Sequence, residues 1–90
     1  MTTREDLETA VLLLVGKACE RALAKEKNRR KTEVQPLRLC IAAIGEEWRE
    51  VQDAYYNREG DDAVIDELGD VIATAGLALW RAHGGNNDRL

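Results

Sequence analysis

Residues 36–57 read PLRLCIAAIGEEWREVQDAYYN and have the apolar spacing of an amphipathic helix. Pro36, the only proline, suits the first turn of such a helix. At about 100° per residue, the larger apolar side chains fall into one stripe. The members of this stripe are Leu37, Ile41, Ile44, Trp48, Val51 and Tyr55. Glu47 lies at the edge of the stripe and Glu50 further round on the same flank, so both acids share one side of the helix.

Residues 61–82, DDAVIDELGDVIATAGLALWRA, repeat this pattern in a further helix. Its apolar stripe consists of Val64, Leu68, Val71, Ala75 and Leu79. Glu67 and Asp70 flank this stripe as Glu47 and Glu50 flank the first one, at a shift of 67 − 47 = 20 residues. The two helices therefore carry matching pairs of acids.

A short link joins these two helices. Gly60 should end the first segment, and Asp61 or Asp62 should cap the helix that follows. Helices joined by so short a link form an antiparallel hairpin. The two helices of such a pair are related by a two-fold axis perpendicular to their common plane. Equivalent flanks of the two helices therefore lie on the same side of that plane. We therefore expect the four acids to converge within about one helical turn.

Four carboxylates that converge beside an apolar stripe repel one another. We expect a cation to neutralise them, and we expect the removal of one charge to stabilise the ion-free protein. Oxygen ligands without histidine or cysteine suit a hard cation, Mg²⁺ or else Mn²⁺. The alternative is a solvated acidic face that holds no ion.

The N-terminal part should add a long helix from Leu7 to about Lys27, capped by Thr3 or Asp6. Consecutive apolar residues in this helix and in the last one would face several directions, and one chain of 90 residues cannot bury them all. We therefore predict an all-α fold, an antiparallel helical bundle completed by homo-oligomerisation as a dimer or a dimer of dimers. The alternative is a monomer that exposes apolar surface.

The composition bounds the class of protein. Ninety residues, 44% of them hydrophobic, suit a single domain over residues 1–90 with a flexible tail over 84–90. Cys19 and Cys40 indicate buried thiols in a reducing compartment. The N-terminus is not that of a signal peptide, and the apolar run 11–15 is too short to span a bilayer. With a formal net charge of −4, we expect a cytoplasmic protein without affinity for membranes, and nucleic acid is not an expected partner.

Two segments, IGEEWRE (44–50) and DELGDV (66–71), resemble the MazG-type family of all-α NTP pyrophosphohydrolases. The signature of that family is E-E-x-x-E, a spacer and then E-x-x-D, and the resemblance covers roughly Pro36 to Trp80. It implies that four acids bind Mg²⁺, and that water attacks a nucleoside triphosphate to release the monophosphate and pyrophosphate. The four implied metal ligands are Glu47, Glu50, Glu67 and Asp70.

The resemblance also names catalytic candidates, Glu46, Glu47 and Glu50. Glu46 completes the signature, but the helical wheel turns it away from the other acids. It could position water, contact a second subunit or be a surface acid. Basic residues that could bind substrate phosphates, or be ordinary solvated charges, are Arg49, Arg58, Arg81 and the stretch Lys25–Lys31. Trp48 and Trp80 could stack on a base, although their positions favour the core.

Two other functions fit the same sequence. A phosphoribosyl-ATP pyrophosphatase has a similar size and a similar acidic helix pair, although the text ELGDV after the spacer fits it less well. A non-enzymatic helical module, with the stretch Lys25–Lys31 on a polyanion, would need no metal. The favoured prediction remains an NTP pyrophosphohydrolase that removes unwanted nucleotides from the nucleotide pool.

Overall fold

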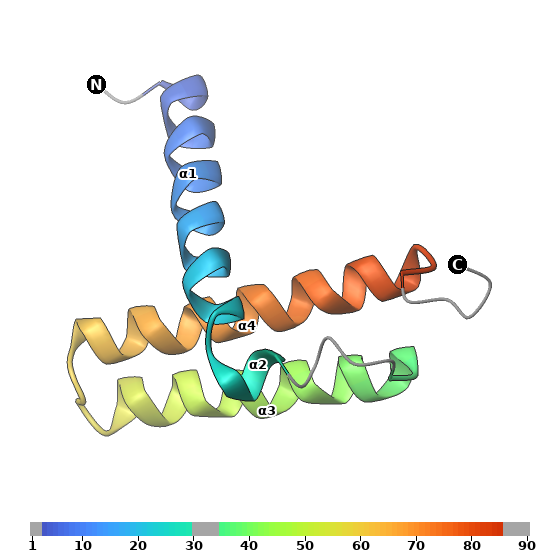
Figure 1. Ribbon diagram of the computed structural model, residues 1–90. Helices are drawn as coiled ribbons and strands as arrows, with labels where there is room; N and C mark the ends of the chain where they lie inside the picture. The colour runs from blue at the N-terminus through green and yellow to red at the C-terminus, as the bar shows by residue number, and fades with distance from the viewer. Residues whose placement is uncertain (1–2, 30–34, 86–90) are drawn as a thin grey trace.

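The computed structural model describes residues 3–29 and 35–85, and the regular structure within those ranges is entirely helical. The helices there are α1 (Arg4–Leu23), α2 (Glu26–Arg29), α3 (Leu37–Tyr56) and α4 (Asp61–Ala82). α3 and α4 run side by side as an antiparallel hairpin, and α1 meets α4 at a steep angle with its N-terminal half pointing away from the hairpin (Figure 1). The predicted all-α class is therefore confirmed.

The α3–α4 hairpin has nearly the bounds that the sequence predicts. Its turn needs left-handed backbone at Arg58 (φ 54°) and at Gly60 (φ 103°), a conformation that glycine adopts without steric cost. Gly60 occupies the N-cap of α4, so the prediction of an aspartate cap was wrong. Asp61 and Asp62 lie in the first turn instead, where the positive end of the helix dipole favours their charge.

The N-terminal helix begins at Arg4, three residues before the predicted start at Leu7, and it also ends earlier than predicted. Thr3 caps α1, because its Oγ1 accepts from the Asp6 amide at 3.1 Å while the Asp6 carboxylate accepts from the Thr3 amide at 3.3 Å. The helix stops at Leu23 and not near Lys27. The buried side chain of Asn28 donates to the Ala22 carbonyl oxygen at 2.7 Å, which satisfies the end of α1 and folds the chain back as α2.

Small residues let α1 and α4 approach closely. A Cβ added to Gly69 would meet the carbonyl oxygen of Ala18 at 3.4 Å, an ordinary van der Waals distance, so the backbones of the two helices lie close together at this point. The buried apolar residues of the described chain are mostly small as well. They are Ala22, Cys40, Val51, Ala54, Ala73 and Ala78. This packing fixes the last turns of α1 against the middle of α4, where Asp70 is buried.

Much apolar surface is exposed in the single chain. Leu12 in α1 is 72% exposed, and Leu13 and Leu14 are similarly open. Trp48 and Trp80, for which core positions were favoured, are each about half exposed. None of the helices in the described ranges is long and apolar enough to cross a membrane. The oligomer is predicted because one chain cannot bury all of its apolar surface. In the described residues, the single chain indeed leaves much of that surface exposed.

The end of α4 lies close to the predicted position. Gly84 takes a positive φ of 91°, and the amide of Gly85 donates to the Trp80 carbonyl oxygen at 3.0 Å. Gly85 is buried, so the chain is still packed at this point. The rest of the predicted tail, residues 86–90, lies outside the described residues.

Candidate metal centre

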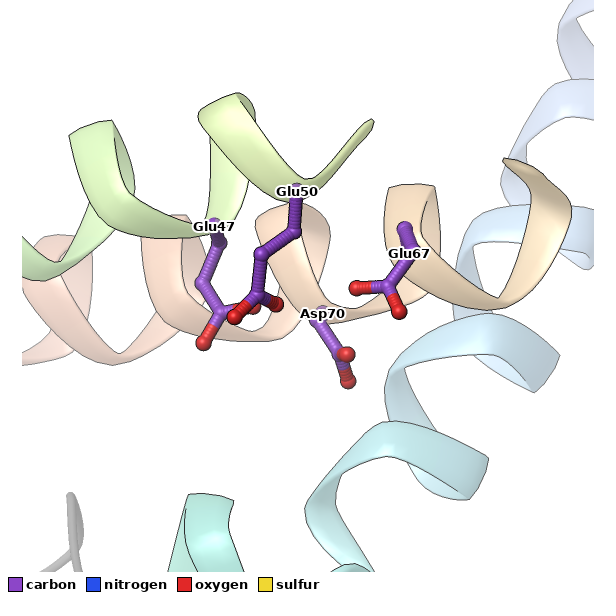
Figure 2. Close-up of side chains that lie close together, drawn as sticks. All are labelled: Glu47, Glu50, Glu67 and Asp70. Carbon is purple, nitrogen blue, oxygen red and sulfur yellow. The ribbon is translucent and has the colours of Figure 1, made fainter. Parts of the chain in front are cut away.

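The hairpin brings four carboxylates together. Glu47 and Glu50 come from α3, and Glu67 and Asp70 come from α4. Each offers one oxygen, and these four oxygens all lie within 4.8 Å of one another. Figure 2 shows the four side chains leaving the two helices toward one region. The structure therefore has the convergence that the matching flanks predict, and we call these residues the four-carboxylate cluster.

Burial is uneven across the cluster. Asp70 is fully buried and Glu47 is only 5% exposed, whereas Glu67 is partly buried and Glu50 is exposed. Glu47 and Asp70 thus form the buried floor of the cluster, and Glu50 lies at its solvent-exposed side. Solvent therefore reaches the cluster at Glu50.

Two lysines that follow α1 supply positive charge to the cluster. The Nζ of Lys25 lies 3.0 Å from Asp70 Oδ1 and 2.8 Å from Asp66 Oδ2. The Nζ of Lys27 lies 2.9 Å from Asp70 Oδ2, with the Glu50 and Glu47 carboxylates at 3.4 and 3.5 Å. The sequence analysis named these lysines only as part of a basic stretch that could bind substrate phosphates, and nothing in the sequence indicates that they reach the acids.

Asn28 is a further residue that the sequence analysis missed. Its side chain is fully buried, and its Nδ2 donates to Asp70 Oδ1 at 3.0 Å as well as to the end of α1. Its Oδ1 is also buried and has no hydrogen-bond partner among the described residues. Asn28 therefore joins α2 to the cluster and leaves one buried acceptor oxygen next to it.

The two acids of α4 differ in their electrostatics. Burial raises the pKa of Asp70, but hydrogen bonds from Lys27, Lys25 and Asn28 outweigh burial and lower the pKa below its usual value. Burial raises the pKa of Glu67, and the hydrogen bond and charge of Glu50 raise it further, to about 7. The expectation that repulsion dominates was therefore wrong for Asp70, whereas it holds for Glu67.

The same contacts raise the pKa values of the two lysines. Partial burial lowers the pKa of Lys27, but the hydrogen bond with Asp70 and the charges of Asp70, Glu47 and Glu50 outweigh it, so the pKa is raised. Lys25 shows the same balance with Asp66 and Asp70. Both ammonium groups are thus held in the charged state by the acids around them.

The donor set fits an oxygen-liganded divalent cation. Mg²⁺ takes oxygens at about 2.1 Å, so ligands on opposite sides of the ion are about 4.2 Å apart. The 4.8 Å spread of the four oxygens needs only a small contraction to match this. Oε2 of Glu67 is buried without a hydrogen-bond partner in the described part of the chain, which is the kind of oxygen that a cation would satisfy. These residues could hold Mg²⁺ or Mn²⁺.

Other predicted site residues lie outside the cluster. Glu46 and Arg49 are exposed on α3, and Arg49 is about 160° round the helix from Glu47. Arg58 lies in the turn, and Arg81 is 81 − 70 = 11 residues beyond Asp70, about 16 Å along α4. Of the predicted basic residues, it is Lys25 and Lys27 that the described structure places at the acids.

No family model, curated protein or solved structure matches the chain. Its likeness to the MazG-type family therefore rests on the two acidic segments alone.

Proposed function

We propose that this protein is a Mg²⁺-dependent nucleoside triphosphate pyrophosphohydrolase that releases a nucleoside monophosphate and pyrophosphate. The observation that carries the proposal is the four-carboxylate cluster, in which two matched acid pairs from antiparallel helices meet within 4.8 Å. Glu67 Oε2 within the cluster and Asn28 Oδ1 next to it are buried without a hydrogen-bond partner among the described residues. Such oxygens favour a bound ion over a solvated acidic face.

In this proposal the four-carboxylate cluster holds the ion. When bound, Mg²⁺ neutralises phosphate charge and lowers the pKa of the attacking water. Asn28 fixes the orientation of the Asp70 carboxylate through its hydrogen bond. Lys25 and Lys27, which lie at Asp70, would add positive charge that offsets the negative charge developing on the pyrophosphate leaving group. Glu46 lies outside the four-carboxylate cluster, so the proposal gives it no part in holding the ion.

We also propose that the protein works as a homo-oligomer. The supporting observation is the exposed apolar surface of α1, where Leu12, Leu13 and Leu14 all lie open. An apolar groove continues this surface between α1 and α4. It is lined by Val11, Leu14, Val15, Ile65, Leu68 and Ile72. Apolar surface of this extent on a small chain is typical of a protein interface.

Pyrophosphate release from canonical and modified NTPs and dNTPs tests the enzymatic function. We expect turnover that requires Mg²⁺ and that Glu47→Gln reduces by roughly a hundredfold or more, because transition-state charge is no longer neutralised. Glu59→Gln, an exposed acid in the inter-helix turn, is the matched control and should keep the wild-type rate.

Phosphoribosyl-ATP belongs in the same panel, since exclusive turnover of that compound would favour the alternative enzyme. The absence of metal-dependent release from every substrate would overturn the proposed function. Salt-sensitive binding of a polyanion without any turnover would favour the helical module.

A further inference from the structure

Lys27 occupies the place of a cation in the four-carboxylate cluster. Its Nζ lies between three carboxylates, 2.9 Å from Asp70, 3.4 Å from Glu50 and 3.5 Å from Glu47. Asp70 and Glu47 form the buried floor of the cluster, and Glu50 lies at its solvent-exposed side. The ammonium group thus sits near the point at which a metal ion would bind the same carboxylates.

A divalent ion and this ammonium group cannot both remain there. An ion held at about 2.1 Å from these oxygens would lie within roughly 4 Å of the Lys27 Nζ, where the two positive charges repel. The Lys27 side chain is free to leave, because it is 45% exposed and has four rotatable bonds. Its backbone lies in α2, which Asn28 anchors to Asp70. The displaced ammonium group therefore stays near the solvent-exposed side of the cluster.

The group that it would meet there is a polyphosphate. A nucleoside triphosphate bound through the ion would bring anionic oxygens to the exposed side of the cluster next to Glu50. A flexible ammonium group is a suitable partner for such oxygens. Lys25 stays paired with Asp66 and Asp70 and keeps the buried carboxylate neutralised during the exchange.

We propose that Lys27 is an exchange residue: it neutralises the empty cluster, is displaced by the metal ion, and then binds the polyphosphate of the substrate. This inference rests on the proposed function. It predicts that Lys27 opposes the binding of metal alone and favours the binding of the metal–polyphosphate complex. The accessibility of Lys27 itself, which should rise when the metal ion displaces it, separates displacement from the general effect of a nearby positive charge.

Two binding measurements on one variant test the exchange. Electron paramagnetic resonance gives the affinity for Mn²⁺ alone, and calorimetry gives the affinity for magnesium tripolyphosphate. We expect Lys27→Met to bind Mn²⁺ about tenfold more tightly than the wild type and magnesium tripolyphosphate about tenfold more weakly. Lys17→Met, an exposed lysine on α1, is the matched control and should change neither affinity. Lys27→Arg keeps the charge and should stay near the wild type.

A second measurement needs no substitution. The rate of reductive methylation of Lys27, followed by mass spectrometry, should rise when Mg²⁺ displaces the ammonium group from the acids. It should fall again when tripolyphosphate is added, while the rate at Lys17 stays constant.

The outcomes separate this inference from the proposed function. If Mn²⁺ binds the wild type and Lys27→Met equally, or binds the variant more weakly, the exchange is wrong while the metal site stands. An unchanged methylation rate with bound Mg²⁺ would refute the exchange in the same way. If neither protein binds Mn²⁺, the proposed function fails together with the exchange.

Discussion

Replacing Glu67 by glutamine should stabilise the metal-free protein, and the gain should depend on pH. The pKa of Glu67 is raised from its ordinary value of 4.5 to about 7 by burial and by Glu50. The folded protein therefore binds this proton more tightly than the unfolded chain does. Between about pH 4.5 and 7 the wild type loses stability as the pH rises, and above pH 7 the full cost of the ionised carboxylate remains.

The size of this effect follows from the pKa. A difference of 7 − 4.5 = 2.5 corresponds to an upper bound of about 3 kcal/mol, and partial exposure of Glu67 reduces it to about 1–2 kcal/mol. Glu67→Gln removes the charge, so it should raise the free energy of unfolding by that amount at pH 8 and by almost nothing at pH 4.5.

Urea unfolding in EDTA at both pH values measures the difference. With saturating Mg²⁺ at pH 8 the order should reverse, because the variant lacks one ligand of the ion. Destabilisation of the EDTA-treated variant at pH 8, or an equal gain at both pH values, would refute the assignment of repulsion to Glu67.

Two further predictions concern the buried acid and the assembly. Asp70→Asn should destabilise the EDTA-treated protein by about 1–3 kcal/mol in the same urea assay, because Lys25 and Lys27 lose a charged partner, whereas Asp66→Asn should cost less because Asp66 is more exposed. Equal effects of the two substitutions would contradict the assignment of Asp70 as the main ion-pair partner of Lys25 and Lys27. Light scattering at micromolar concentration should give at least twice the chain mass of 10.1 kDa, and a fully active monomer would rule out the proposed assembly.

The hairpin could be predicted from sequence because it depends on residues that are close together in the chain. The apolar stripes of α3 and α4 fix the flank on which each acid lies, and the short turn at Gly60 fixes the antiparallel pairing. These two facts suffice to bring Glu47 and Asp70 together. Neither depends on any contact with α1.

The surroundings of the cluster depend on contacts that no periodic pattern encodes. The break after Leu23 arises from the hydrogen bond between Asn28 and the Ala22 carbonyl, and an asparagine within a polar stretch gives no sign of it. Lys25 reaches Asp70 across 45 residues of sequence. Arg81 was proposed for its charge alone, and its distance along α4 excludes it from the cluster.

The central claim is that Glu47, Glu50, Glu67 and Asp70 bind one divalent cation, and anomalous diffraction from a crystal soaked in Mn²⁺ tests it most directly. The account predicts a peak about 2.2 Å from one oxygen of each acid, with the Lys27 ammonium group displaced from Asp70. A map without a peak at these acids, in which Lys27 still pairs with Asp70, would contradict it.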